Sequence, residues 1–358
     1  MAKLFYNIAN NAKTTITNNP LSNSGTSITL SAGTGTKFPS EYFVATIWDD
    51  TTYPSNPGGD PNMEIVYCDS RSTDTVTVNS SGRGFGGTTG VQHNSGSSFA
   101  ILDTKQFEDQ MTTALTTGWV PVADTWAYAS VDNPTGVVTI PTNGTTTYSV
   151  GMRIKFTNGG NTVYGIVTAV AATSLTFLHE INVSTPTQAL YIMQNSAITN
   201  IYVSHVKTPY GFPSDPRSWT VYVHDDTTRT QSTPEANTWY NLGTIKITIP
   251  IGAWDVEYNC DLGIIDTNTT TFEGFVTLST ANNTESNTKM TTRRAMNNTT
   301  TNVTSDYLVY TARGQMNISS KTDHFLNAKT SQSNIDTISM NSGSRTDGVR
   351  LYARCNYL

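Results

Sequence analysis

Short segments in which hydrophobic and polar residues alternate run through the first hundred residues, and this alternation is typical of half-buried β-strands. Glycine, proline and asparagine separate the segments, and the connection "DDTTYPSNPGGDPN" predicts a long exposed loop. Strands so short and closely spaced favour a small barrel or sandwich. The five segments are residues 27–30, 42–48, 63–68, 75–78 and 98–102.

One segment has the spacing of a helix instead. Phe107, Met111 and Leu115 recur at every fourth position and form one apolar stripe. Asp103, with a glutamine three residues later, is a candidate N-terminal cap, and Gly118 stands where a C-terminal cap belongs. The stripe packs either on a neighbouring barrel or on the same stripe of other copies around an axis, and the sequence leaves both alternatives open.

Residues 119–211 return to alternating patterns, with Asn-Gly turns at Asn143–Gly144 and Asn158–Gly159 that suit tight hairpins. Segments 64–78 and 165–177 both consist of an apolar strand, a short polar turn and an alternating strand. We therefore predict a second small barrel that is a variant of the first. Its strands are expected at residues 136–140, 152–156, 163–170, 174–178 and 189–193.

A segment rich in proline, residues 207–216, marks the next boundary. Strand-like segments, several of them long, follow it with polar loops between them, and this pattern fits an antiparallel sandwich of jelly-roll type. They are residues 219–225, 243–251, 254–265, 272–278, 306–318, 336–340 and 349–358.

The predicted fold class is therefore all-β: two small β-barrel-like domains joined by a short helix, followed by a C-terminal antiparallel β-sandwich that is jelly-roll-like. The predicted domains are an N-terminal small barrel at 1–103, a connecting helix at 104–118, a second small barrel at 119–211 and a C-terminal knob at 212–358. Composition agrees, because threonine, asparagine and serine are abundant, whereas charged residues make up only 13% of the chain.

Charge and hydropathy exclude several classes of partner. The net charge is −6 and no basic cluster is present to bind phosphates, so we expect no nucleic acid partner. No apolar run approaches the roughly 18 residues of a membrane span, and the N-terminal residues lack the apolar stretch of a secretory signal. We expect synthesis in a cytosol and no membrane insertion. Three widely spaced cysteines are expected to be buried free thiols: Cys68, Cys260 and Cys355.

The segment "GRGFGG" has the glycine spacing of a dinucleotide-binding loop at Gly82, Gly84 and Gly87, and Asp103 follows at about the distance of the ribose-binding acid. Such a site needs a helix directly after the loop, because the pyrophosphate binds the N–H groups at the helix N-terminus. Further glycines and an asparagine follow here instead. We therefore predict no nucleotide site and no cofactor.

Candidate metal ligands are few. Asp49, Asp50, Asp60 and Glu64 offer carboxylates for calcium around one loop, although adjacent aspartates at a strand end are usually a solvated turn. We predict no metal site and leave calcium at this loop open. Five histidines lack the spacing of zinc ligands: His93, His179, His205, His224 and His324.

Candidate catalytic carboxylates lie in the last domain. Asp255 and Glu257 are two residues apart on one predicted strand and share a face, and a glycosidase needs two carboxylates that flank the bond. Acids alternating with apolar residues are also the default pattern of a half-buried strand, which is the interpretation that we favour. We predict no catalytic residues and no enzyme. The other acids considered are Asp225, Asp226, Glu235 and Asp261.

Long uncharged loops of the last domain, residues 266–271 and 280–306, are rich in hydroxyl and amide groups. Such groups can hydrogen-bond to sugar hydroxyls, and nearby tyrosines or tryptophans offer flat faces to a sugar ring. The same composition would also simply keep an assembly soluble. The sequence therefore does not identify the receptor-binding residues.

Several segments resemble virion proteins of tailed bacteriophages. "GRGFGGTTGVQHNSGSSFAIL", after "FPSEYFVATIWDD" and "MEIVYCDSRSTDTVTV", is similar to a segment common in those proteins, in which glycines let a hairpin loop turn back on a barrel. "GWVPVADTWAYAS", "YSVGMRIKF" and "VYGIVTAVAATSLTF" look like the module that often follows it. "RTQSTPEANTWYNLGTIKITIPIGAWDVEYN" with "LSTANNTES" is similar to the terminal domains of phage fibre-type proteins.

The resemblance implies a non-enzymatic structural protein of the virion, made in the host bacterial cytoplasm. It implies a tail fibre or tail-associated protein, a homotrimer, fixed to other virion proteins by its N-terminal domains, with host-surface glycan attachment by the C-terminal domain. The alternative is a head fibre or a capsid-decorating protein. A polysaccharide depolymerase is the less favoured third class.

Overall fold

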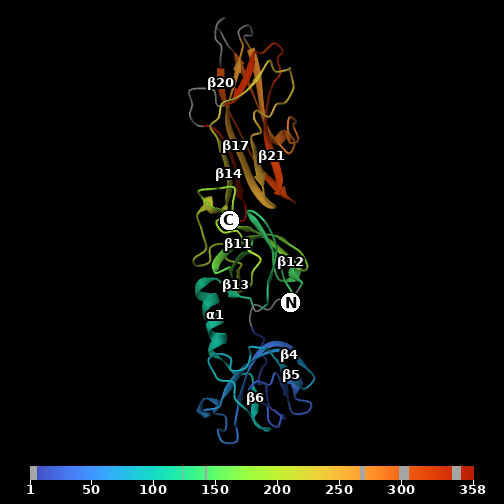
Figure 1. Cartoon of the computed structure of the whole chain (residues 1–358), viewed down its shortest axis with the longest axis vertical. Coiled ribbons are helices and arrows are strands. Elements are labelled where there is room, and N and C mark those ends of the chain that lie inside the picture. The colour runs from blue at the N-terminus through green and yellow to red at the C-terminus, as the bar shows by residue number, and fades with distance from the viewer. Residues whose placement is uncertain (1–5, 123, 142, 267–270, 298–305, 341–347) are drawn as a thin grey trace. The chain divides into compact units, whose positions relative to one another are not determined.

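The computed structural model describes residues 6–122, 124–141, 143–266, 271–297, 306–340 and 348–358 (Figure 1). It divides into two compact units, of which unit 1 is Met1–Thr125 with Asn200–Ser204 and unit 2 is Trp126–Thr199 with His205–Leu358. The fold is all-β, as predicted, with antiparallel sheets in both units.

Unit 1 contains a six-stranded sheet that closes on itself. Its edge strands meet at an isolated bridge between Ile16 and Leu30, and the Thr17 N–H donates to the Thr29 carbonyl at 2.7 Å. This contact joins the two edges, so the sheet forms the small barrel that the strand pattern predicts. In spatial order the strands are β1 (Lys13–Thr15), β6 (Ser98–Ala100), β3 (Glu41–Trp48), β4 (Glu64–Ser72), β5 (Thr75–Val78) and β2 (Ser27–Thr29).

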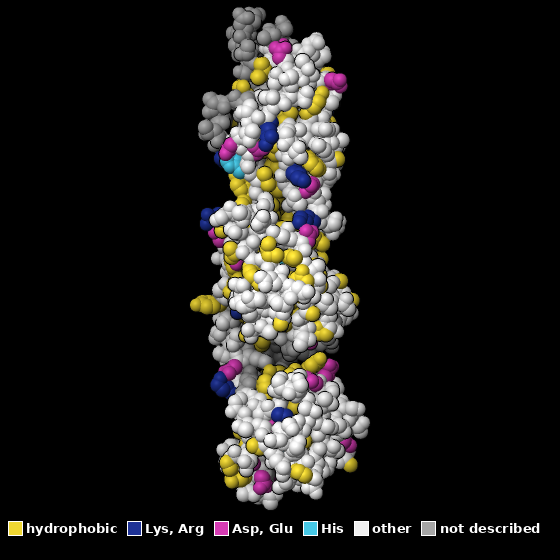
Figure 2. Space-filling model, viewed as in Figure 1, with side chains coloured by type: hydrophobic (Ala, Val, Ile, Leu, Met, Phe, Trp, Pro, Cys, Tyr) yellow, Lys and Arg dark blue, Asp and Glu magenta, His cyan; other side chains and the backbone are white. Residues whose placement is uncertain are grey.

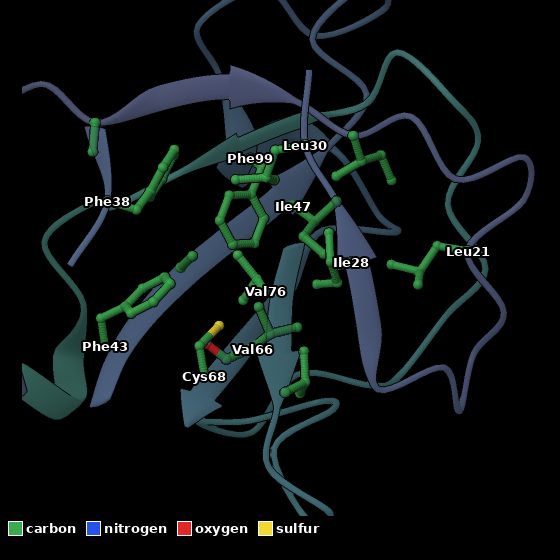
Figure 3. Close-up of a cluster of buried hydrophobic side chains, with 14 residues drawn as sticks. Leu21, Ile28, Leu30, Phe38, Phe43, Ile47, Val66, Cys68, Val76 and Phe99 are labelled. Atoms are coloured by element: carbon green, nitrogen blue, oxygen red, sulfur yellow. The ribbon is translucent and has the colours of Figure 1, made fainter. Parts of the chain in front are cut away.

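The barrel is filled by apolar side chains from β2, β3, β4, β5 and β6 and from the segments next to the strands. Figure 3 shows Phe38, Phe43 and Phe99 at one end of this core, with the Phe38 and Phe99 ring centres 5.1 Å apart. Val76 and Val78 of β5 are buried, while Thr75 and Thr77 of the same strand are exposed. The period of two along each strand therefore directs the apolar residues inward.

The predicted helix is α1 (Lys105–Thr117). Thr104 rather than Asp103 occupies the N-cap position, because Thr104 has the extended backbone that precedes the helix. Gly118 is the C-cap in the left-handed conformation, as predicted, with a φ of 71°. Met111 and Leu115 of the apolar stripe are 38% and 80% exposed in this chain. Among the described residues, no helix combines the length and apolarity that crossing a bilayer requires.

After α1, β7 (Val120–Pro121) pairs with β13 (Ile198–Ser204) through the contacts of Val120 with Val203 and Pro121 with Tyr202. Unit 2 then begins with a sheet around the rings of Trp126, Phe156 and Phe177. In spatial order its strands are β10 (Arg153–Asn158), β11 (Asn161–Val170), β12 (Ser174–His179), β9 (Thr135–Thr139) and β8 (Ala127–Asp132).

One predicted strand of this region is wrong. Residues 189–193 form a loop with a single bridge from Ala189 to Ile181, and Leu190 and Ile192 are 57% and 45% exposed. In the part of the chain that the structure describes, this run has a single bridge and no ladder, so it is not a strand.

The rest of unit 2 is a sandwich of two antiparallel sheets. The Tyr258 hydroxyl of one sheet donates to the Val276 carbonyl of the other at 2.8 Å, and both residues are fully buried between the sheets. One sheet has the order β14 (Thr220–Asp225), β23 (Val349–Cys355), β17 (Gly252–Ile265), β22 (Thr337–Met340) and β15 (Arg229–Ser232), with β20 (Asp306–Ile318) also paired to β17. The other has the order β16 (Lys246–Ile249), β21 (Thr322–Thr330), β18 (Thr271–Ser279) and β19 (Thr291–Asn297).

The connections between strands include five 3-10 helices. These are η1 (Gly35–Lys37), η2 (Pro57–Gly59), η3 (Gly144–Thr146), η4 (Pro216–Trp219) and η5 (Thr288–Met290). The second small barrel region and the sandwich belong to the same compact unit, and the predicted domain boundaries at residues 103, 118 and 211 stay predictions.

Candidate functional site

The glycine-rich segment at residues 82–87 is a loop between β5 and β6, organised by a buried ionic cluster. Glu64 of β4 is fully buried and accepts hydrogen bonds from Arg83 Nε at 2.6 Å and Arg83 Nη2 at 2.8 Å. His93 Nε2 lies 3.0 Å from the same carboxylate. We call Glu64, Arg83 and His93 the Glu64 cluster.

Backbone groups complete the Glu64 cluster. The N–H groups of Gly84 and Val91 donate to Glu64 at 2.8 and 3.2 Å, and Arg83 donates to the carbonyls of Ser22, Gly25 and Val91. The cluster therefore ties the glycine-rich loop, the segment before β6 and the loop before β2 to a single carboxylate. Both carboxylate oxygens of Glu64 and all three guanidinium nitrogens of Arg83 have partners, as buried charges require.

Electrostatics favour the ionised form of Glu64. Burial by itself raises the pKa of this carboxyl, but the hydrogen bonds from Arg83, His93 and the Gly84 N–H, with the charge of Arg83, outweigh burial and lower the pKa to about 2. The carboxylate is thus held charged by its partners as part of the structure.

The loop at residues 82–87 differs in geometry from a dinucleotide-binding loop. The Gly84 N–H, which a dinucleotide loop would offer to phosphate, is bonded to Glu64. The next helix is α1, which begins at Lys105 after β6, and Asp103 is an exposed residue just before it. The loop therefore lacks the helix N-terminus on which a pyrophosphate would lie.

The four carboxylates considered for calcium have separate partners. Asp49 accepts bonds from Thr51 and Thr52, Asp60 accepts from the Asp49 N–H at 2.8 Å, and Glu64 belongs to the Glu64 cluster. Asp50 pairs with Lys13, whose ammonium group lies 2.7 Å away and, with a bond from the Ser55 N–H, lowers the pKa of Asp50 to about 2. Within the described ranges, no three His, Cys, Asp or Glu side chains come together as a metal site.

The two carboxylates considered for catalysis do share a face of β17, as the spacing predicts, and each is paired with an arginine of a neighbouring strand. Arg313 Nε lies 2.8 Å from Asp255 Oδ2, and Arg354 Nη1 lies 2.8 Å from Glu257. The other acids are dispersed: Arg229 binds Asp225, His224 binds Asp226, Asp261 is buried, and the Glu235 N–H bonds to the Tyr240 hydroxyl.

The remaining histidines lie apart from one another. His179 is fully buried, and burial lowers its pKa to about 4; burial also lowers the pKa of His324. His205 is exposed. All three cysteines are buried free thiols, as predicted, and burial raises the pKa of each, that of Cys355 to about 11. The contact of His93 with Glu64 is not predictable from the sequence, because the two residues are 29 positions apart and spacing along the chain holds no information about it.

A pocket of about 420 Å³ lies beside β14 and β23 in unit 2, and sequence reasoning missed it. Val183, Pro186 and Pro216 line it with apolar groups, and Tyr352 with Arg354 lines it from β23. We call it the tyrosine pocket. The signal in the sequence is the outward-facing Tyr222 and the Tyr352–Arg354 pair, but only the pairing of β14 with β23 brings these residues together.

The loops considered for glycan binding lie partly outside the described residues, at 267–270 and 298–305. In the described part, Asn327 Nδ2 donates to the carbonyls of Ala281 and Thr284, so the loop after β18 is anchored to β21.

Neither the family models nor the curated proteins contain a match to this chain. Among solved structures it is similar to an isomalto-dextranase of Arthrobacter globiformis T6 complexed with panose, at 10% identity over 66% of this chain and 35% of that one, with a TM-score of 0.19. It is also similar to the VP2 subviral particle of infectious bursal disease virus, at 10% identity over 99% of this chain and 77% of that one, with a TM-score of 0.23. A third is the exo-beta-1,3-galactanase of Phanerochaete chrysosporium with galactose, at 7% identity over 95% and 99% and a TM-score of 0.16.

The chain spans about a third of the length of the dextranase. With TM-scores this low, the three likenesses carry no argument about the function of this chain.

Proposed function

We propose that this chain is a non-enzymatic structural protein of a tailed-bacteriophage virion, of the tail-fibre or tail-associated kind. The segment "GRGFGGTTGVQH", which carries the resemblance to virion proteins, supports this proposal because its Arg83 and His93 contact Glu64 in the Glu64 cluster. In that cluster the glycine-rich loop has a mechanical role, which is to hold a barrel in one conformation.

One observation supports the non-enzymatic part of the proposal: the two carboxylates considered for catalysis are each paired with an arginine. Asp255 and Glu257 are held by Arg313 and Arg354 across the sheet. A glycosidase needs one acid that keeps its proton and one carboxylate that acts on water or sugar. Asp255 and Glu257 are instead each occupied by an arginine of a neighbouring strand, and such cross-strand pairs fix strand register.

The surface supports a role in assembly and contact. Figure 2 shows a face that is mostly uncharged, on which basic and acidic side chains lie in small separate groups, several of them next to each other. In the proposed function the N-terminal barrel attaches to other virion proteins, three copies form a homotrimer, and the C-terminal sandwich binds glycans of the host surface. No nucleic acid or membrane takes part.

A map of the whole phage particle with this chain labelled tests the proposal. We expect the label on the tail or its fibres, whereas a label on the shell would favour a head fibre or capsid-decorating protein. Absence of the chain from purified particles would overturn the virion assignment.

A second assay separates the depolymerase alternative. Purified protein incubated with host capsule or wall polysaccharide is expected to release no reducing ends. Release that disappears in both Asp255→Asn and Glu257→Gln, but persists in Asn259→Ala on the same strand, would show that the chain is an enzyme.

A further inference from the structure

The tyrosine pocket is held rigid by a stack of side chains on β14 and β23. The rings of Tyr222 and Tyr352, which are paired across the two strands, lie 4.6 Å apart and nearly parallel. The His224 ring is also nearly parallel to the Tyr222 ring, with the ring centres 6.1 Å apart, and the Arg354 guanidinium lies 4.9 Å from the centre of the Tyr352 ring. The stack fixes the rotamers of these side chains, so a ligand would find the pocket already formed.

The walls of the pocket are apolar and its charged groups are guanidinium groups. Val183, Pro186 and Pro216 supply C–H surface, while Arg217 and Arg354 supply charge. The lining, as far as the chain is described, contains no acidic side chain. A pocket of about 420 Å³ is within the range of small-molecule sites, roughly 300–1,000 Å³.

Both arginines retain donors for a ligand. Arg354 binds Glu257 through Nη1, and Arg217 binds Asp215 through Nε and Nη2. A guanidinium carries five N–H donors in a planar fork, so these bonds leave at least one terminal nitrogen of each arginine for a carboxylate at the pocket.

We propose that the tyrosine pocket binds a pyranose that carries a carboxylate, as in a polymer of acidic sugars. The C–H face of the ring packs on Val183, Pro186 and Pro216, and the carboxylate accepts from Arg354 and Arg217. The Tyr222 and Tyr352 hydroxyls offer donors and acceptors to the ring hydroxyls. This inference rests on the proposed attachment to host glycans, and it gives that attachment a site and a sugar class.

Binding of simple glycosides to the full chain tests the site. The probes are methyl β-glucuronide and the methyl α-glycoside of N-acetylneuraminic acid, with methyl β-glucoside as the neutral comparison, measured by saturation-transfer NMR and calorimetry. We expect binding of at least one acidic probe and much weaker binding of the neutral one. Binding of neither acidic probe, or equal binding of the neutral probe, would overturn the proposal.

Variants locate the binding on the molecule. Arg354→Gln is expected to weaken binding about tenfold or more, because a charge-assisted hydrogen bond is lost. Val183→Trp is expected to block the pocket while it leaves both arginines in place. Arg313→Gln is the matched control, since Arg313 forms the same kind of cross-strand pair on the same sheet but is not part of the pocket. Equal weakening by Arg313→Gln, with thermal unfolding unchanged in all three variants, would place the binding elsewhere.

The outcome is distinct from that of the particle map. Failure of both acidic probes removes the acidic-sugar site but leaves the labelled chain on the virion. Absence of the chain from the virion removes the proposed function but leaves measured binding at Arg354 intact.

Discussion

Glu64 is the residue on which the order of unit 1 most depends. It is fully buried, and its carboxylate oxygens accept bonds from a guanidinium, an imidazole and two backbone N–H groups. A buried charge without hydrogen-bond partners destabilises the folded state. The groups that contact Glu64 are therefore held in the positions in which they hydrogen-bond to its carboxylate.

Arg83→Ala is expected to lower the free energy of unfolding by about 3–5 kcal/mol, because it leaves Glu64 buried without its main counter-charge. Urea unfolding measures this change. Lys13→Ala is the control: Lys13 also pairs with a carboxylate, but it is 44% exposed, so its loss should cost less than about 1 kcal/mol. Equal costs for the two variants would show that the Glu64 cluster does not stabilise the barrel.

The same cluster predicts how acid affects the protein. The pKa of Glu64 is about 2 in the folded chain and 4.5 for an ordinary glutamate, so its contribution is fully present above pH 4.5 and is lost as the pH falls through 2. We expect the stability advantage of the wild type over Glu64→Gln, on the order of 3 kcal/mol, to disappear across this window. Urea unfolding at several acidic pH values measures it, and a constant difference across the window would contradict the role of Glu64 as a carboxylate.

At the scale of elements, the two small-barrel regions share one construction. The β4–β5 hairpin shifts register between Cys68 and Ser70, and the β11–β12 hairpin shifts between Val167 and Ala169. The strands around them lie in the same order, β3–β4–β5–β2 and β10–β11–β12–β9. In both regions the register shift lies in the hairpin formed by the second and third strands of this order, which agrees with the repeat between segments 64–78 and 165–177. Only the first region has the Glu64 cluster, since Gly165 stands in segment 165–177 where Glu64 stands in segment 64–78.

Two glycines of the loop after β5 allow the energetic cost of a strained backbone to be distinguished from the cost of a steric clash. Gly84 and Gly87 both have positive φ, 60° and 87°. A Cβ on Gly84 would lie 2.7 Å from the Gly90 nitrogen, whereas a Cβ on Gly87 would meet nothing within 4 Å. Gly87→Ala should therefore cost about 1 kcal/mol from conformation alone, and Gly84→Ala should cost about 1–3 kcal/mol more because backbone must move.

Thermal and urea unfolding of the two alanine variants measure these costs. Similar costs for the two variants would mean that the loop backbone moves freely around residue 84. The hydrogen bond from the Gly84 N–H to Glu64 would then not constrain the loop.

At the scale of the whole molecule, unit 2 joins two sheet systems through one buried guanidinium. Arg153 of β10 is 1% exposed and donates to the carbonyls of Gly151, Lys207 and Tyr357 at 2.6, 2.9 and 2.7 Å. Lys321 adds a second link, to Asp132 at 2.6 Å. The sandwich and the sheet of β8–β12 are therefore expected to unfold together.

Arg153→Ala tests this coupling. We expect it to lower the stability of unit 2 by about 3 kcal/mol or more, because three carbonyls lose a charged donor. Hydrogen exchange followed by mass spectrometry should show β10–β12 and β14–β23 losing protection together. The control, Lys246→Ala, removes an exposed pair with Asp323 and should change protection little. Loss of protection in only one of the two sheet systems would show that they are independent.

The sequence by itself determined the strands whose buried positions are apolar. In β23 Val349, Leu351, Ala353 and Cys355 are buried, and the residues between them are not, as their alternation predicts. Gly118 likewise marks the end of the helix, because a left-handed C-cap depends only on the local backbone. Such features are readable because burial on one face of a strand follows the period of the chain itself.

Tertiary structure alone decided the features that depend on partners distant in sequence. Segment 322–330 is a strand that the sequence analysis does not name. Its buried positions include Asn327, which donates to carbonyls of the loop after β18. The Glu64 cluster and the tyrosine pocket likewise arise where strands and loops from separate segments meet. The alternation of residues along a strand shows which side of that strand is buried. Which strand or loop lies next to it is set by how the sheet closes. A polar side chain can be buried only where that neighbouring strand or loop supplies its hydrogen-bond partners.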